Sequence, residues 1–474
     1  MRSTHKYLAQ ITLLCLISGI MGCKKFVSIP PPTTELVTTN VFSSDATATA
    51  AQTVIYSQME ANMESFEAAL QNGLLGDELT TYSSTQTTLE FYMNAMQAKD
   101  ILTPWSGAYN YIYQANAVLN GLQSNNGVTA AGRQQLMGEA TFTRAFWLFL
   151  LANCYGDVPI TTSTDYVVNA AISRSPKSDV FQQVIADLTN AVNLLNPNYV
   201  DGTDTATTND RIRPNKWSAM ALLARAYLYA GKYDSSELAS TSVINSGAYI
   251  LCQDLDSVFL ADNTEAIWQI PPTEPSSNPI TPDAQFFVLT TAPGSALQAN
   301  TTISPQLMAA FENGDLRKAD WIGVYPSDTT NYYFPNKYKL IQTSSPLEYT
   351  VVLRLAEQYL IRAEAEANLN DLTDAATDLN TIRHRAGLPN IADSIASSQT
   401  SLLTAIVHER QVELFCEWGH RWFDLNRTGT INNVMSVVTP LKTAGQPWSP
   451  YMALYPLPLT ELKSDPKLVQ NPGY

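Results

Sequence analysis

The stretch of sequence that decides the fold runs from residue 354 to residue 388 and reads RLAEQYLIRAEAEANLNDLTDAATDLNTIRHRAGL. Small and apolar residues recur around Asn370-Asp371 at the spacing of one helical face, namely Ala363, Leu372, Ala375, Leu379 and Ile382. Asn and Asp favour turns because their short polar side chains bond to the local backbone. The stretch therefore predicts two antiparallel helices, over residues 352–368 and 372–384, joined by a short turn.

A second helix pair is predicted earlier in the chain. Ala224, Tyr227 and Tyr233 surround Gly231, so that small and aromatic residues let helices over 217–229 and 232–245 pack around a glycine turn. Both pairs resemble tetratricopeptide helix hairpins. Further helical patterns cover residues 40–63, 105–119, 131–155, 178–195 and 402–418. We therefore expect a mostly α-helical scaffold of tetratricopeptide-like hairpins with little β-structure, with Trp105, Trp147 and Trp217 in its core.

Composition excludes several classes of protein. Of 474 residues, 45% are hydrophobic and 15% charged, so the chain has ample material for a core and is not globally disordered. The net charge is -15, and basic residues form no long run, which argues against a nucleic-acid partner. Three cysteines of the body, Cys154, Cys252 and Cys416, lie among apolar neighbours and are expected to be buried thiols. Their scatter predicts neither a disulfide framework nor a zinc site.

The N-terminus has the pattern of an export signal. Arg2 and Lys6 precede an apolar run, over 8–21, that is too short to span a bilayer. The run ends in Ile20-Met21-Gly22-Cys23, which resembles a bacterial lipobox; a plain signal peptide cut nearby is the alternative. We expect residues 1–22 to be a lipoprotein signal peptide, Cys23 to be lipidated, and 23–38 to form a proline-containing tether. A single helical domain over 39–474 would follow.

The densest cluster of ionisable residues offers little for catalysis. Glu409, Glu413 and Glu417 are spaced for one helical face, beside arginines of neighbouring helices. A glycosidase carboxylate pair is one interpretation. We favour a structural ion-pair network, because the carboxylates alternate with core-type residues. The sequence has no phosphate loop, dinucleotide fingerprint or nucleophile elbow, and the acidic stretch 201–210 does not match a calcium loop. We expect no enzymatic activity, cofactor or metal.

A long insert over about 271–341 has another character, because it is rich in proline and aromatic residues. Long irregular segments in compact proteins are usually functional. Sugars present flat C–H faces fringed by hydroxyls, so exposed rings flanked by polar groups suit them. The candidate ligand residues of the insert and of the segment 77–94 are Asp77, Tyr82, Tyr92, Asn94, Trp321, Tyr325, Tyr332 and Tyr333. Asp77 follows a predicted Gly-Leu-Leu-Gly turn together with Glu78, and for any single ring the alternative is burial.

Five segments in order carry a family resemblance. They cover residues 138–159, 354–365, 379–388, 409–427 and 455–474, and include Tyr155-Gly156-Asp157-Val158-Pro159 and Arg421-Trp422-Phe423-Asp424. Together with the lipobox, these segments resemble the SusD/RagB family of outer-membrane lipoproteins.

The resemblance implies a helical frame of four tetratricopeptide-like units with no catalytic activity. Such a protein would be lipid-anchored at the outer membrane, on the cell surface, as a lid on a SusC-like TonB-dependent barrel. It would capture a nutrient, commonly an oligosaccharide, for import. The family often has an acidic residue where this chain has Val27-Ser28, which bears on surface display against a periplasmic location. The alternative function is a tetratricopeptide-type protein-interaction scaffold in the periplasm, with a helical groove and buried aromatic loops.

Overall fold

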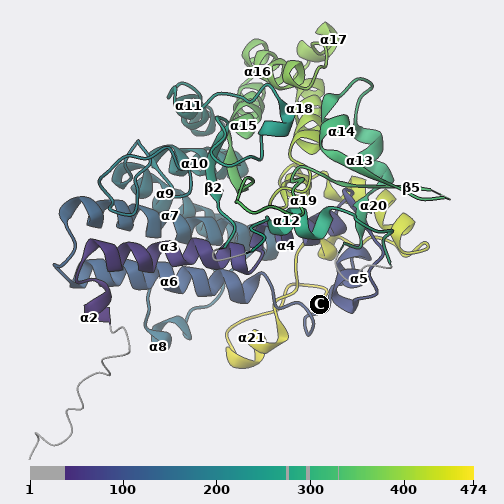
Figure 1. The fold of residues 1–474 in the computed structure, drawn as a ribbon. Coiled ribbons are helices and arrows are strands. Elements are labelled where there is room, and N and C mark those ends of the chain that lie inside the picture. The colour runs from purple at the N-terminus through teal and green to yellow at the C-terminus, as the bar shows by residue number, and fades with distance from the viewer. Residues whose placement is uncertain (1–37, 274–276, 295–298, 329) are drawn as a thin grey trace, which may run out of the picture.

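The computed structural model describes residues 38–273, 277–294, 299–328 and 330–474 (Figure 1). The chain is mostly helical, as predicted, and its described strands are short. The predicted signal peptide, the lipidated Cys23 and nearly all of the tether lie outside the described residues. The first described element, α2 (Thr38–Val41), lies at the edge of the body.

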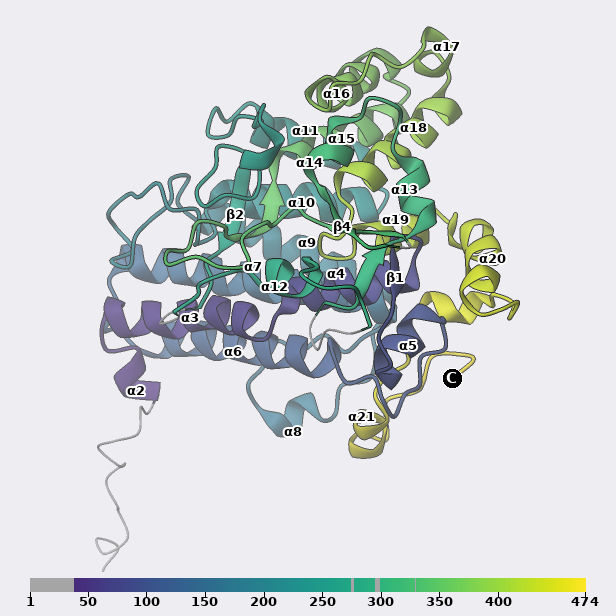
Figure 2. The ribbon, with the colours of Figure 1, turned by 45° about the vertical axis from the view of Figure 1, so that its right-hand side comes forward.

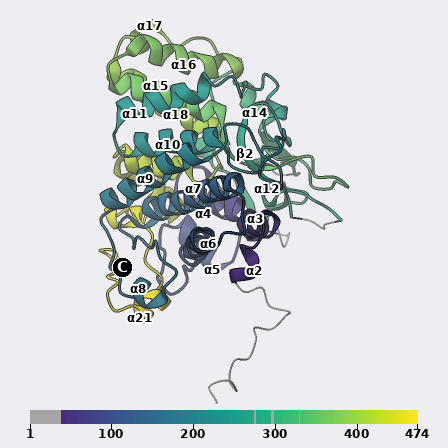
Figure 3. The same cartoon turned by 90° about the vertical axis from the view of Figure 1, so that its left-hand side faces the viewer.

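The helices follow one another in a stack. A first group contains α3 (Asp45–Ala61), α6 (Trp105–Ser124), α7 (Ala130–Tyr155) and α9 (Lys177–Leu194), which lie side by side (Figure 1). A second group contains α10 (Lys216–Tyr229), α11 (Tyr233–Ile244), α15 (Leu355–Asn368), α16 (Leu372–Arg385) and α18 (Gln399–Glu413). The second group continues from α9 through α10 and α11 to α15, against which both α16 and α18 pack (Figure 3).

The two predicted hairpins have the expected turns. Gly231, between α10 and α11, has a φ of 68° and Asn370, between α15 and α16, also has a φ of 68°. Glycine and asparagine are the residues that best tolerate this left-handed conformation. Asp371 then caps α16, because its side chain accepts a hydrogen bond from the backbone N–H of Asp374.

The strands form three separate antiparallel pairs within the described part of the chain. The pairs are β1 (Leu79–Thr81) with β3 (Thr301–Ile303), β2 (Ala266–Ile270) with β6 (Thr350–Arg354), and β4 (Ile322–Pro326) with β5 (Asn331–Pro335). Strand β6 corrects the predicted helix start, because 352–354 are extended and the helix begins at Leu355. Val351 and Val352 are buried against β2, where β-branched side chains favour a strand.

Short helices complete the fold. They are α4 (Glu64–Leu75), α5 (Gln86–Tyr92), α8 (Tyr166–Asn169), α12 (Pro282–Phe287), α13 (Pro305–Ala310), α14 (Leu316–Asp320), α17 (Asp393–Ala396), α19 (His420–Arg427), α20 (Ile431–Lys442) and α21 (Leu459–Ser464), with two 3₁₀ turns, Leu255–Ser257 and Pro450–Ala453. The insert over 271–341 carries α12 to α14 and β3 to β5, joined by irregular segments (Figure 2).

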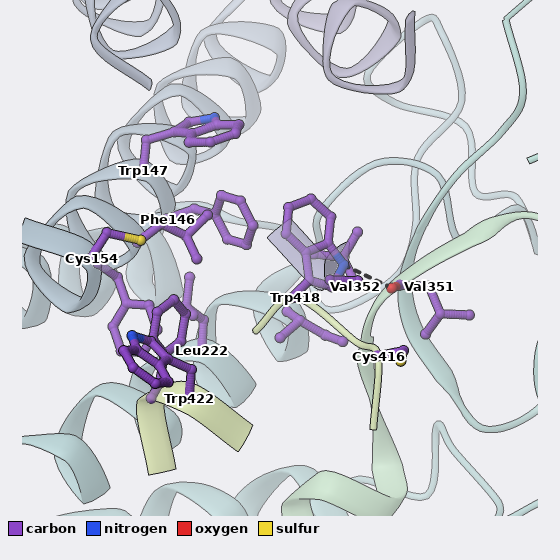
Figure 4. Close-up of a cluster of buried hydrophobic side chains, with 14 of the residues drawn as sticks. Phe146, Trp147, Cys154, Leu222, Val351, Val352, Cys416, Trp418 and Trp422 are labelled. Carbon is purple, nitrogen blue, oxygen red and sulfur yellow. Dashed lines mark hydrogen bonds between the residues drawn. The ribbon is translucent and has the colours of Figure 1, made fainter. Parts of the chain in front are cut away.

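The main core lies between α7, α10 and the segment that follows α18 (Figure 4). Trp147, Trp418 and Trp422 are almost fully buried, and the Trp418 indole N–H donates to the carbonyl of Val351 at 3.0 Å. Trp105 is buried as predicted, whereas Trp217 is half-buried and packs against the core from its edge. The cysteines Cys154, Cys252 and Cys416 are buried free thiols, which confirms the sequence interpretation.

Helix length and hydropathy bear on membrane insertion. Among the residues that the structure describes, no helix combines the length and the apolar character that crossing a bilayer requires.

Candidate ligand-binding site

The β4–β5 hairpin brings the tyrosines of the insert together. Tyr325 lies opposite Tyr332, and Val324 lies opposite Tyr333, in neighbouring positions of the ladder. Because successive side chains of a strand point to opposite faces, Tyr325 and Tyr332 share one face and Tyr333 lies on the other. The hairpin projects from the side of the helical stack that also carries α5 and α20 (Figure 1).

Apolar packing supports the hairpin face that carries Tyr325 and Tyr332. Tyr325 and Tyr332 pack beside a small apolar cluster of Leu289, Ala299 and Phe334. The ring of Phe334 covers Gly323 on the facing strand, where an added Cβ would lie 2.2 Å from it. A residue larger than glycine at position 323 would displace that ring, so glycine is required for this face.

Tyr82, which lies far from the hairpin in sequence, is close to the hairpin tyrosines in the fold. The Tyr82 backbone N–H donates to the carbonyl of Asn300 at 2.8 Å, which continues the β1–β3 pairing by one residue. This places the Tyr82 ring edge-on to the Tyr332 ring, with centroids 5.6 Å apart. Tyr82 is 45% exposed and Tyr333, on the opposite hairpin face, is 38% exposed.

Tyr92, at the end of α5, is half-buried close to Tyr82. Burial raises the pKa of the Tyr92 hydroxyl, which therefore stays protonated at neutral pH. We call Tyr82, Tyr92, Tyr325 and Tyr332 the tyrosine surface. It combines rings with hydroxyls that can both donate and accept hydrogen bonds.

Lys442 supports this surface and is not apparent from the sequence. Its ammonium lies 5.5 Å from the centroid of the Tyr92 ring and donates to the last carbonyls of α4, including that of Leu74 at 2.6 Å. Cations at a helix C-terminus satisfy carbonyls that lack helical partners. Burial lowers the pKa of Lys442 to about 7. Only proximity in the fold reveals this lysine, because 350 residues of sequence separate α5 from the end of α20.

Asp77 is not available to a ligand, which corrects the sequence interpretation. Its carboxylate is buried and forms a bidentate ion pair with Arg421, at 2.8 Å to Nε and 2.7 Å to Nη2. The predicted turn before it is instead the last turn of α4. Glu78 is also buried, and desolvation raises the pKa of its carboxyl to about 8.

Asn94 and Trp321 are also buried rather than exposed. The Asn94 amide donates to the carbonyl of Leu75 at 2.8 Å and accepts from the Thr439 hydroxyl at 2.9 Å. Trp321 is 0% exposed, and its indole N–H donates to the carbonyl of Leu255 at 3.0 Å. The expectation that these two side chains face solvent is therefore wrong, because distant segments cover both of them.

The glutamate cluster is an ion-pair network. Glu413 pairs with Arg317 at 2.9 Å and also with Arg354 and Arg385. These guanidinium groups hold the pKa of the Glu413 carboxyl well below its ordinary value although the group is fully buried. A carboxylate so enclosed by arginines lacks the open cleft that glycoside hydrolysis requires.

Glu409 and Glu417 extend the same network. Glu409 pairs with Arg317 at 2.7 Å, and Glu417 pairs with Arg354 at 2.9 Å. The predicted helix over 402–418 is too long, since α18 ends at Glu413 and Glu417 lies in the turn that follows. In that turn Cys416 and Trp418 have positive φ values, of 52° and 47°. Among the described residues, no group of three or more His, Cys, Asp or Glu side chains could hold a metal ion.

Comparison with known proteins defines the class. The model of the SusD family matches residues 283–474, and a second family model, described as starch-binding and associating with the outer membrane, matches residues 31–228. The matches account for both the helical stack and the C-terminal segments that surround the ion-pair network. The two models together cover most of the chain, which belongs to the SusD/RagB family.

Relatives cover most of the chain. A SusD-like protein, P25, of Formosa agariphila is 24% identical in an alignment of 455 positions that covers 84% of this chain and 84% of that protein. A solved structure described as a laminarin-binding SusD-like protein has a TM-score of 0.73 at 24% identity, over 90% of this chain and 99% of that one. The structure of surface glycan-binding protein A from Bacteroides uniformis has a TM-score of 0.75 at 19% identity, over 90% of this chain and 99% of that one. These structural similarities show that the fold is shared.

Proposed function

We propose that this protein is a non-catalytic lipoprotein that binds an oligosaccharide at the tyrosine surface. The observation that carries the proposal is the meeting of Tyr82 and Tyr332, from segments 250 positions apart, on a supported hairpin at the edge of the fold. Exposed rings stack on the C–H faces of sugars, and the phenolic hydroxyls bond to the hydroxyl fringe.

Several further observations support glycan binding. The tetratricopeptide-scaffold alternative requires that the aromatic loops be buried, whereas Tyr82 and Tyr333 are exposed. Two structural neighbours are described as binding laminarin and surface glycans. The absence of an open carboxylate pair at Glu413 supports binding without turnover.

The proposed partner is a SusC-like TonB-dependent barrel of the outer membrane. Cys23 would anchor the protein through its lipid, on the cell surface, and the body would act as a lid that passes bound nutrient to the barrel. The second matching family model, with its description as associating with the outer membrane, supports this location. Purification of the tagged, anchored protein in mild detergent tests the partnership: we expect a large β-barrel protein to co-purify, and its absence would contradict the delivery role.

A glycan array tests the binding function. The protein is expected to bind at least one oligosaccharide class on the array, and laminarin provides a defined first probe in solution. Tyr82→Ala and Tyr332→Ala should each weaken binding, because each removes a ring on which the C–H face of a sugar can stack. Tyr333→Ala tests the opposite face of the same hairpin and should have the smaller effect.

Tyr113→Ala is the matched control, because Tyr113 is 51% exposed on α6, outside the tyrosine surface. It should leave affinity unchanged. If the array showed no binding, or if Tyr82→Ala and Tyr332→Ala bound as well as Tyr113→Ala, the tyrosine surface would not be the glycan site.

A further inference from the structure

A pocket lies away from the tyrosine surface, between α4, the first turn of α6 and the last turns of α7. Its volume is about 360 Å³, within the range of about 300–1,000 Å³ that is typical of small-molecule sites. Trp147, Leu150 and Phe423 form an apolar wall, and Glu64 and Glu67 lie among the polar lining residues. We call this the carboxylate pocket.

The two glutamates are one helical turn apart on α4 and therefore face the same side. Neither forms an ion pair within the described part of the chain, in contrast to the glutamates of the central network. Burial raises the pKa of Glu64 to about 7, and Glu67 adds to this shift. Burial likewise raises the pKa of Glu67. The Glu64 carboxyl is therefore partly protonated near neutral pH, and a cation bound beside the two glutamates would stabilise their charged forms.

Each carboxylate uses one oxygen for a neighbour and leaves the other available. Glu64 Oε1 accepts from the Tyr111 hydroxyl at 2.9 Å, and Glu67 Oε2 accepts from the Gln71 amide at 2.8 Å. Glu64 Oε2 and Glu67 Oε1 have no hydrogen-bond partner among the described residues. The neighbours therefore orient both carboxylates while an acceptor on each remains unused.

Trp147 forms part of the wall of the same pocket. Its ring is 1% exposed and stacks on Tyr111 with centroids 4.6 Å apart, which fixes its orientation. Its indole N–H finds no acceptor in the described structure. Buried donors are nearly always satisfied, and an unsatisfied one is costly. Because this N–H is itself buried, the pocket is lined by the Trp147 ring and not by its donor.

We propose that the carboxylate pocket binds a small hydroxylated primary amine, with Glu64 and Glu67 accepting from its ammonium group. The polar lining residues Thr103 and Ser106 would face its hydroxyl groups. An ammonium offers three donors and the positive charge that the two carboxylates lack. Charge-assisted hydrogen bonds to a carboxylate are the strong class. The apolar wall would contact the carbon body of the ligand, so an amino sugar or an amino alcohol fits this chemistry.

The test compares glucosamine with glucose, since the two sugars differ in an ammonium against a hydroxyl at one carbon. Each is titrated calorimetrically into the full-length protein at neutral pH. Glucosamine is expected to bind at least tenfold more tightly than glucose. Glu64→Gln and Glu67→Gln should each reduce glucosamine affinity at least tenfold, because each removes a charge but keeps the side-chain shape.

Glu461→Gln, the same chemical change on α21, is the matched control and should leave the affinity unchanged. Thermal melting shows whether each variant folds; an amide in place of a buried carboxylate should not lower the melting temperature. Equal binding of glucose and glucosamine, or full glucosamine affinity in both folded glutamine variants, would overturn the proposal. Laminarin binding by the pocket variants is a separate readout and should be retained, because it reports on the tyrosine surface.

Discussion

The buried charges of this protein differ in what each side chain contributes to stability. Glu413 is 0% exposed and pairs with three arginines at once, so removing its charge leaves three buried guanidinium groups with one anionic partner fewer each. Glu312, by contrast, pairs with Arg383 from a side chain that is 41% exposed. The ion pairs of buried Glu413 therefore contribute more to stability than the exposed ion pair of Glu312.

Glu413→Gln is expected to lower the free energy of unfolding by about 3–5 kcal/mol, the usual cost of breaking a buried ion pair. Glu312→Gln, the control, should lower it by less than about 1 kcal/mol, because water screens the exposed pair. Urea denaturation followed by circular dichroism measures both. Equal effects at the two positions would contradict the structural role of the network.

The buried carboxyl group of Asp283, in the first turn of α12, should make the stability of the protein depend on pH. Burial raises the pKa of its carboxyl to about 7, and its Oδ2 has no partner in the described residues. The folded state therefore holds a proton that the unfolded chain releases near its ordinary value. Stability from this group is greatest below about pH 4 and falls as pH rises toward 7.

Asp283→Asn should remove the loss of stability that occurs as the pH rises toward 7. The melting temperature of the variant relative to the unmodified protein should rise between pH 4.5 and pH 7.5, as scanning calorimetry at several pH values can measure. Asp328→Asn changes an exposed aspartate and should show no such trend. A difference that stayed constant with pH would show that Asp283 does not titrate in this range.

At the scale of elements, periodicity predicted the helices well and the strands poorly. Helix α7 was expected over 131–155 and spans Ala130–Tyr155, because its apolar spacing is long and uninterrupted. The periodicity does not predict the β4–β5 hairpin, because its aromatic residues Tyr332, Tyr333 and Phe334 follow one another without alternation and its proline-rich surroundings resemble a loop. The turn after α18 could not be foreseen, since Glu417 is fixed by Arg354 from another element.

The turn of the α10–α11 hairpin can be tested directly. Gly231 has a φ of 68° and no atom within 4 Å of an added Cβ, so Gly231→Ala introduces backbone strain without a clash. The expected loss of stability is about 1 kcal/mol. Gly202→Ala is the control, because that glycine also has open space but lacks a positive φ. Urea denaturation should leave Gly202→Ala unchanged; similar losses in both variants would contradict the assignment of strain to Gly231.

The candidate site shows where sequence reasoning ends. Tyr82, Tyr325 and Tyr332 could be selected as rings in polar segments, and the fold brings them together. Asp77 and Trp321 were selected on the same grounds, but their burial depends on partners from distant segments, Arg421 and Leu255. Composition does not reveal such long-range contacts, so only some of the selected side chains are accessible.

At the scale of the whole molecule, a helical stack supports the β4–β5 hairpin and its tyrosine rings. Membrane anchoring can be tested independently of ligand binding, because Cys23 lies well before the first described helix in the sequence. Stable membrane attachment requires more than one acyl chain, as a lipoprotein N-terminus provides.

Cys23→Ser should therefore move the protein from the membrane fraction to the soluble fraction, while laminarin binding is retained. Fractionation with metabolic palmitate labelling measures the first effect and calorimetry the second. The matched control, Cys15→Ser, changes a cysteine inside the predicted signal peptide and should leave the anchoring intact. Continued membrane attachment and labelling of Cys23→Ser would contradict the lipidation of this residue.

The most direct measurement is a crystal structure of the protein with an oligosaccharide selected on the array. We expect a sugar ring within about 4.5 Å of the rings of Tyr82 and Tyr332, with its hydroxyls toward the phenolic oxygens. An oligosaccharide bound at another face, in contact with neither of these rings, would contradict capture at the tyrosine surface.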